Sequence, residues 1–270
     1  MDDAALTIML ERVWARDAVA MASALSAQDP TWGTETLAVA GGQLVLSGRG
    51  MYVNRAIAVG IDPALRPADI GLIDARSTAA GVPAAVEVTP ATHAESRALL
   101  TAYGFVHDEG RDVRALVRPL TDLPAELSRP GITVMPVSER SLDEWRAISA
   151  LGFGHATPET RRASDAFARA AHVVDGDGMV IAVDSEDGRP LGCASMTINA
   201  TVATLGGMST IPAERGRGVQ ATLILHRLGV AREAGCSLAA ATTVVGGDSE
   251  RNVQRYGFRP LHVKQTRLHQ

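Results

Sequence analysis

The same succession of helix, strand and turn patterns occurs twice along this chain, and this repeat limits the possible folds more than any other feature. In each half a proline is followed by a helical pattern, a glycine, a β-type run, a polar turn and a short helix. Tyr-Gly-Phe closes both copies, at residues 103–105 and 256–258. Gly81 lies 23 residues before Gly104, and Gly235 lies 22 residues before Gly257. This recurrence indicates duplicated architecture, with two unrelated strand–helix–strand units as the alternative.

A proline-rich segment separates the two copies. Residues 118–131 hold three prolines and no apolar period, which is typical of a linker. A chain of 270 residues corresponds to one large domain or two small ones, and a hydrophobic fraction of 46% suffices for a globular core. We therefore expect two domains, at 1–127 and 128–270.

Composition excludes several classes of protein. The net charge of −4 gives no basic footprint for nucleic acid or for an anionic membrane. The acidic start of the chain lacks the basic region of a signal peptide, and no apolar stretch is long enough to span a bilayer. Cys193 and Cys236 lie in apolar stretches without metal-ligand spacing, so we expect two reduced core thiols. A cytoplasmic protein without a metal site is expected.

The clearest chemical signal lies between residues 201 and 235. Two β-type runs flank Gly206 and Gly207, and such paired glycines suggest a bulge or the close approach of a ligand. Pro212 ends this strand because it has no N–H to donate. An amphipathic helix is expected from about residue 220 to residue 234, with Gly235 placed to end it. Its apolar face carries Ala221, Ile224, Leu225, Leu228 and Ala231.

The turn between that strand and helix, Arg215-Gly216-Arg217-Gly218, suits an anion. A loop that opens a helix exposes unpaired N–H groups, and glycine lets the backbone curve around a ligand without a Cβ in the way. The helix dipole and two arginines add positive charge. The turn lacks the ending of a Walker loop and does not meet Gly-x-Gly-x-x-Gly. We expect a phosphate or pyrophosphate site, with a basic, flexible surface turn as the alternative.

Residues 210–219 resemble the acyl-CoA signature of the GNAT superfamily, [Gln/Arg]-x-x-Gly-x-[Gly/Ala], at the end of a central strand. Arg215 matches the first position and Gly218 the fourth, whereas Gln220 stands where Gly or Ala is usual and is followed by Ala221. Residues 255–259 resemble the Gly-Phe element that starts the last strands of that fold. The likeness covers the C-terminal half and, more weakly, the N-terminal half. The chain is thus similar to tandem GNAT proteins in which one copy is degenerate.

This resemblance implies an α/β fold (α+β mixed sheet) of two GNAT-like domains in tandem, each a twisted mixed sheet with helices on both faces. The copy at 1–127 would be degenerate, and the copy at 128–270 would bind acyl-CoA. The implied cosubstrate is acetyl-CoA, with its pantetheine between two splayed strands. The implied cofactor-binding residues are Met208, Ser209, Thr210, Arg215, Gly216, Arg217, Gly218, Val219, Gln220 and Ala221.

Acyl transfer to an amine needs a base for the amine and an acid for the leaving thiolate. Members of the family often have a tyrosine four residues before the Gly of Gly-Phe, and that position here is Val253. Tyr256 is either the acid or a core residue. Ser249 and Asn252 share a helical face and could bond pantetheine or relay a proton, although Ser249 also suits an N-cap. His155 is either the base or a capping loop histidine; an ordered water as base, and departure of the thiolate to solvent, are further alternatives.

We interpret the chain as an N-acetyltransferase that moves the acetyl group of acetyl-CoA to a small-molecule amine by direct attack. A non-catalytic acyl-CoA sensor, which Val253 favours, and a mycothiol synthase-like tandem acyltransferase are the alternatives. We expect a monomer or homodimer without a nucleic-acid or membrane partner. Tyr52, Asn54 and Arg55 either help to bind the acceptor or are ordinary polar residues of a sheet face.

Overall fold

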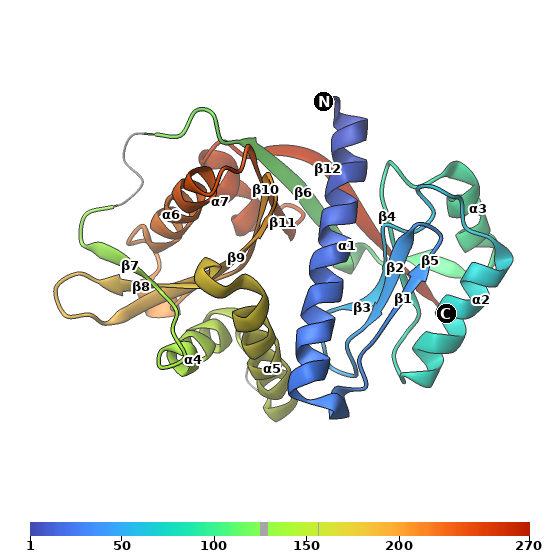
Figure 1. Cartoon of the computed structure of the whole chain (residues 1–270), viewed down its shortest axis with the longest axis horizontal. Helices are drawn as coiled ribbons and strands as arrows, with labels where there is room; N and C mark the ends of the chain where they lie inside the picture. Colours follow the sequence, from blue (N-terminus) through green and yellow to red (C-terminus); the bar gives the residue numbers. More distant parts are fainter. Residues whose placement is uncertain (125–128, 156) are drawn as a thin grey trace. The chain divides into compact units, whose positions relative to one another are not determined.

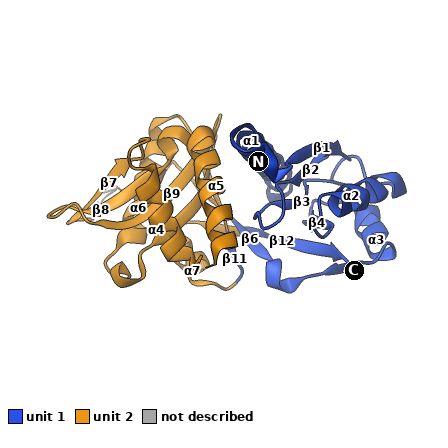
Figure 2. Ribbon diagram, turned by 90° about the horizontal axis from the view of Figure 1, so that it is seen from below, with its two compact units in different colours: residues 1–115, 243–245, 261–270 blue, residues 116–242, 246–260 orange. Residues whose placement is uncertain are grey.

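The computed structural model describes residues 1–124, 129–155 and 157–270 (Figure 1). They form two compact units, coloured separately in Figure 2. Unit 1 comprises Met1–Ala115, Thr243–Val245 and Leu261–Gln270, and unit 2 comprises Leu116–Thr242 and Gly246–Pro260. Each unit therefore includes residues from both halves of the sequence. The expected boundary between residues 127 and 128 lies outside the described residues.

Unit 1 is built on a mixed sheet with the strand order β1-β2-β3-β4-β12, and β5 pairs with β12. In the described part of this unit β3 and β4 run parallel, whereas β1–β2, β2–β3, β4–β12 and β5–β12 are antiparallel pairs. Its elements are α1 (Asp3–Gln28), β1 (Glu35–Val39), β2 (Gly42–Leu46), β3 (Asn54–Ile57), α2 (Pro67–Ala79), β4 (Ala85–Val88), α3 (Ala94–Ala102), β5 (Phe105–His107) and most of β12 (Arg259–His269).

The long helix α1 packs on the strands of unit 1 through small side chains. Ala15, Ala18 and Ala22 recur at helical spacing and form a buried cluster with Val45 and Ile57. The Asp2 carboxylate caps the helix by accepting from the backbone N–H of Ala5. The same spacing also places Glu11 on a buried face of the helix, where it joins a polar cluster described below.

In unit 2 the strand order is β7-β8-β9-β10-β11-β6, and the strands again run in mixed directions. The pair β10–β11 is parallel, and β7 to β10 are antiparallel neighbours. The helix α4 packs on β9 and β10, α5 packs on α4 and β9, and α6 packs on β7 to β10. The elements are β6 (Val113–Pro119), β7 (Ile132–Pro136), α4 (Leu142–Phe153), α5 (Pro158–Asp175), β8 (Val180–Asp184), β9 (Pro190–Asn199), β10 (Val202–Thr210), α6 (Val219–Glu233), β11 (Leu238–Val244) and α7 (Asp248–Arg255).

The duplicated order of signals corresponds to duplicated structure. The run β3-α2-β4-α3-β5 in the first half matches β10-α6-β11-α7-β12 in the second. Gly104 and Gly257 follow α3 and α7 with φ of +81° and +79°, a left-handed conformation that glycine adopts without strain. Phe105 and Phe258 then enter the two cores at 2% and 3% exposure. The glycines end the helices, and the phenylalanines anchor the strands that follow.

Two features differ from the expected organisation. Arg118 and Pro119 belong to β6 and not to a linker, because the apolar run before them is buried and Leu120 is buried as well. The last strands are exchanged between the halves: β12 lies beside β4 of unit 1, and residues 116–119 of β6 lie in unit 2, whose β11 neighbours β6.

Among the described helices, none is long and apolar enough to cross a membrane.

Candidate functional site in unit 2

The two parallel strands of unit 2 pair over only part of their length. Val202 to Leu205 of β10 pair with Leu238 to Ala241 of β11. Beyond Leu205, β10 continues to Thr210 on its other neighbour, β9, and β11 continues to Val244. Within the described structure, the facing edges of β10 and β11 are thus unpaired past this point. Unpaired strand edges offer backbone N–H and C=O groups to an extended ligand.

A β-bulge interrupts β10 at the start of its unpaired stretch. The register with β9 shifts between Gly206 and Ser209, so the bulge expected at the paired glycines is present. Gly207 has φ of +53°, and a Cβ there would lie 2.9 Å from the Ser195 hydroxyl oxygen. Both facts favour glycine, because another residue would be strained and crowded. The bulge turns the backbone of Met208 and Ser209 relative to a regular strand.

A buried arginine lies under this bulge. Arg227 of α6 is 1% exposed, and its Nη1 donates to the carbonyl oxygens of Ser195, at 2.8 Å, and Gly206, at 3.1 Å. Nη2 donates to the Met208 sulfur at 3.1 Å. Burial lowers the pKa of Arg227 to about 9, so the guanidinium is still charged at neutral pH. No carboxylate of the described residues forms an ion pair with Arg227. Its guanidinium is instead hydrogen-bonded to carbonyl oxygens of both strands at the bulge, Ser195 of β9 and Gly206 of β10.

The helix α6 opens without any side-chain cap. Gly218 is its N-cap residue with φ of +87°, and Gly216 before it has φ of +82°. The intrahelical hydrogen bonds begin with the N–H of Thr222, which donates to the Gly218 carbonyl at 3.0 Å. The first turn of α6 contains no acidic residue. The N–H groups of residues 219–221 are therefore available to an anion at the positive end of the helix dipole.

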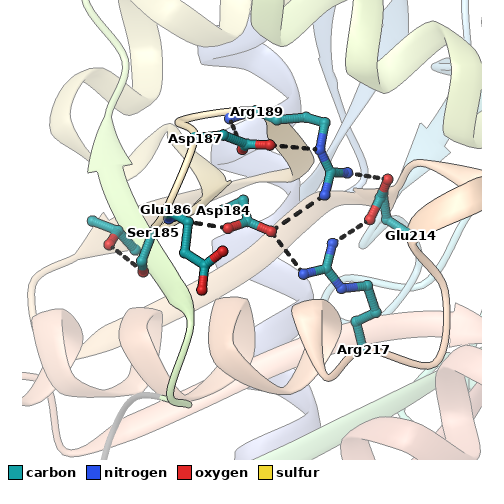
Figure 3. A network of polar contacts seen from close by, with 8 residues as sticks. Asp184, Ser185, Glu186, Asp187, Arg189, Glu214 and Arg217 are labelled. Atoms are coloured by element: carbon teal, nitrogen blue, oxygen red, sulfur yellow. Dashed lines mark hydrogen bonds and ion pairs between the residues drawn. The ribbon is translucent and has the colours of Figure 1, made fainter.

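Four charged side chains fix the turn from outside (Figure 3). Arg217 donates to Asp184 at 2.7 Å and to Glu214 at 2.6 Å, and Arg189 contacts both of the same carboxylates. The hydrogen bond from Arg217, followed by that from the Glu186 amide, lowers the pKa of Asp184. Arg217 is thus committed to orienting the turn, whereas Arg215 is exposed and makes no ion pair among the described residues. Of the two predicted arginines, Arg215 has the charge left for a ligand.

The side chain of Gln220 reaches from the turn to α7. Its Oε1 accepts from Asn252 Nδ2 at 2.5 Å, and Arg255 donates to Asn252 Oδ1 at 2.9 Å. This link places Asn252 beside the turn and directs the Gln220 side chain toward α7. Ser249 is exposed at the second position of α7, whose N-cap is Gly247. The interpretation of Ser249 as N-cap is therefore wrong, because the helix begins at Asp248, two residues earlier than that role requires.

The remaining predicted catalytic residues come from two other places. Tyr256 is the C-cap residue of α7 and packs, partly buried, against the core that contains Val253. His155 follows α4, and its ring stacks on Phe153 at a centroid distance of 5.9 Å. The helix α4 contacts the bulged strand, since the Ser209 hydroxyl donates to the Ile148 carbonyl at 3.2 Å. The segment that carries His155 thus leaves a helix anchored on β10.

Sequence reasoning did not identify Arg227, Asp184 or Glu214. Arg227 interrupts the apolar face of α6 between Ile224 and Leu228. The apolar residues around it on the helix are the one sequence signal that this arginine is buried. Asp184 and Glu214 are brought together by contacts that span 33 residues (Arg217 to Asp184) and 25 residues (Arg189 to Glu214), and no local pattern reports these contacts. Among the described residues, no group of three potential metal ligands lies close enough to hold an ion.

Comparisons with known proteins relate this site to a family. A sequence model of the acetyltransferase (GNAT) family matches residues 142–258. A search of curated proteins finds none that matches the chain. Three similar solved structures are a GCN5-related N-acetyltransferase from Kribbella flavida (19% identity, 94% of this chain and 95% of that one, TM-score 0.60), a tandem GNAT protein from the clavulanic acid biosynthesis pathway (19%, 84% and 77%, 0.60) and a GCN5-related N-acetyltransferase from Sphaerobacter thermophilus (18%, 79% and 71%, 0.58).

At these identities the solved structures establish a shared fold, and they do so over most of the chain. The mixed α/β class with GNAT-like architecture, expected from the sequence, is confirmed. The family model adds sequence likeness over the segment that holds the bulge, the glycine turn, α6 and α7. Residues 142–258 thus form a domain of the acetyltransferase (GNAT) family.

Proposed function

We propose that unit 2 binds acetyl-CoA and transfers its acetyl group to the amine of a small molecule. The observation that carries this proposal is the uncapped start of α6 beside the bulged, unpaired edge of β10. The amides of residues 216–221 and the Arg215 guanidinium would hold the pyrophosphate. The pantetheine would then extend along β10 and pair with the backbone of Met208, Ser209 and Thr210.

In the proposed reaction the amine nitrogen attacks the thioester carbonyl, and a tetrahedral oxyanion forms. A backbone N–H aimed by the bulge would stabilise that oxyanion, which is the step where preorganised donors contribute most. Collapse of the intermediate breaks the C–S bond and releases the thiolate of CoA. The amine proton passes to a base, for which His155 or a water is the candidate, and Tyr256, or a relay through Ser249 and Asn252, would protonate the thiolate.

The first half of the chain is proposed to be a degenerate copy without a phosphate turn. The helix that corresponds to α6 is α2, and its N-terminus is already occupied: the Asp69 carboxylate accepts from the backbone N–H of Arg66 at 2.9 Å. The Arg66 side chain also donates a hydrogen bond to Asp69, and this bond is the main reason why the pKa of that carboxyl is lowered. A negative side chain at the helix start repels phosphate. Acyl-CoA would therefore bind in unit 2.

A non-catalytic acyl-CoA sensor is the second candidate. It is favoured by Val253, which is 3% exposed in the core and cannot supply a proton. Binding and turnover distinguish the two functions. An acetyltransferase releases free thiol from acetyl-CoA in the presence of some amine of a panel, whereas a sensor binds acetyl-CoA and releases none.

The binding claim is tested by calorimetric titration of acetyl-CoA into the wild type and into Arg215→Glu/Gly218→Asp. We expect this double variant to lose binding, because it puts two carboxylates where the pyrophosphate would lie and strains the N-cap residue. Arg232→Glu is the matched control, since Arg232 is an exposed residue at the other end of α6. Equal affinity of the double variant and the wild type would contradict the proposal.

A further inference from the structure

Unit 1 holds a pocket of about 330 Å³ that is lined by three arginines, Arg49, Arg55 and Arg111. Tyr52, Asn54 and Gly81 also line it, and no aspartate or glutamate is among the described lining residues. The pocket lies at the amino ends of β3 and β4, because Asn54 and Ala85 are the first residues of these strands. The proposed phosphate turn of unit 2, in contrast, follows the carboxyl end of β10.

Arg55 is held in place by a buried ion-pair network. Its Nε lies 3.0 Å from Glu87 Oε1, and the Glu87 side chain is 5% exposed. The ammonium of Lys264 contacts Glu87 at 2.8 Å and Glu11 at 3.3 Å, and it lies over the Trp14 ring. The two carboxylates are thus balanced by Lys264 and Arg55. The network fixes a partly exposed guanidinium at the wall of the pocket without adding net negative charge.

The loop that carries Arg49 is fixed by Asn54. The Asn54 side chain accepts from the N–H groups of Ser47, at 2.9 Å, and Gly48, at 3.2 Å. Its amide nitrogen donates to the carbonyls of Gly48, at 2.9 Å, and Met51, at 3.0 Å. Asn54 therefore uses its whole amide group on the loop. What it does is position the loop from which Arg49 extends.

The charges of Arg49 and Arg111 are available to a ligand. Arg49 is exposed and forms no ion pair within the described part of the chain. Arg111 pairs with Asp108 at 3.1 Å, but both side chains are at least one-third exposed, and such surface pairs contribute about 0–1 kcal/mol and exchange readily. Gly81 lies beside Arg49, and its φ of +67° favours glycine at this wall of the pocket.

We propose that this pocket binds a small molecule that carries phosphate or carboxylate groups. Planar guanidinium forks match both oxyanions bidentately. Arg49 and Arg111, whose charges no buried carboxylate neutralises, therefore favour an anion in a pocket with no acidic lining residue. The volume is at the lower end of the range of about 300–1,000 Å³ for small-molecule sites, so a metabolite-sized ligand fits and a whole coenzyme A does not. This site is separate from the proposed acyl-CoA site.

The test is calorimetric titration of the full chain with inorganic phosphate and, separately, with citrate, at an ionic strength held constant with potassium chloride. We expect saturable binding of at least one anion, and the anion that binds identifies the recognised group. In Arg49→Met/Arg111→Met the dissociation constant should rise about tenfold or more. The matched control is Arg232→Met/Arg251→Met, which removes one exposed arginine and one arginine of an i,i+3 surface pair, and it should bind as the wild type does.

A second variant separates this proposal from the acyl-CoA site. Arg215→Glu/Gly218→Asp, which should lose acetyl-CoA, should keep its affinity for the anion. Loss of anion binding in that variant would assign the anion to the turn of unit 2 and overturn the proposal. It is also overturned if neither anion binds saturably to the wild type, or if Arg49→Met/Arg111→Met binds as tightly as the wild type with an unchanged melting temperature.

Discussion

Replacement of Arg227 by methionine tests whether the buried guanidinium holds the bulge of β10. Methionine retains much of the apolar stem and removes every donor. The Ser195 and Gly206 carbonyls would then lose their contacts at 2.8 and 3.1 Å in a site that is closed to solvent. The substitution also removes a buried charge, whose desolvation opposes folding. The lost hydrogen bonds therefore lower the free energy of unfolding, and the relieved desolvation raises it.

The expected size follows from those contacts. A hydrogen bond to a charged donor contributes about 1.5–3 kcal/mol, so two cross-strand carbonyls account for roughly 3–6 kcal/mol. Relief of the desolvation of the guanidinium offsets part of this, and we expect a net loss of about 2–4 kcal/mol in the free energy of unfolding. Because a small displacement of reacting groups can reduce a rate about a hundredfold, thiol release should also fall by tenfold or more.

The assay is urea unfolding of Arg227→Met and Arg227→Lys, with Arg232→Met on the exposed face of the same helix as control. The control should change stability by no more than about 0.5 kcal/mol. Lysine keeps the charge but cannot reach both carbonyls with one ammonium group. The free energy of unfolding of Arg227→Lys should therefore lie between those of the wild type and Arg227→Met. If Arg227→Met were as stable as Arg232→Met, the guanidinium would not be what holds the bulge.

Three further outcomes are expected. Gly152→Ala should destabilise unit 2 by about 1–3 kcal/mol, because its Cβ would lie 1.6 Å from the Ser209 hydroxyl oxygen; Ser209→Ala in the same chain should restore part of the loss, and additive effects of the two substitutions would contradict this contact. Tyr256→Phe should change the melting temperature more than the rate, and a hundredfold rate loss with normal melting would instead make Tyr256 the acid. Burial alone would raise the pKa of Glu87, but the positive charges of Lys264 and Arg55 outweigh burial and lower that pKa below 4.5. The resulting stabilisation of the folded state is present above pH 4.5 and is lost as the pH falls through the folded-state pKa. Glu87→Gln should therefore make the unfolding free energy of unit 1 less dependent on pH in acid, and an unchanged dependence would refute the network.

Local signals predicted much of this structure. The glycines at the ends of α3 and α7 and the buried phenylalanines after them are short-range features, and they identified the duplicated architecture correctly. The bulge at Gly206, the helix over Val219–Glu233 and the GNAT likeness could also be predicted, because strand-breaking glycines, a proline and an apolar face lie within one short segment. The binding role of that turn stays a prediction.

Long-range partnerships could not be predicted from the sequence. Arg227 is 32 residues from Ser195, and periodicity reports that a position faces the core but not which carbonyl it meets there. The exchange of β12 into unit 1 likewise depends on which strand edges are open after both halves have folded, and a linear sequence does not state this. The pocket of unit 1 combines Tyr52, Asn54 and Arg55, which are close in the sequence, with Arg111, which lies far along the chain, so no local pattern indicates it.

The proposed site is tested most directly by the electron density of a crystal of the protein grown with coenzyme A. We expect the pyrophosphate against the amides of residues 216–221 with Arg215 beside it, and the pantetheine paired with β10 from Met208 to Thr210. Density for the cofactor elsewhere on the chain, with the turn before α6 empty although the cofactor is bound, would contradict the account.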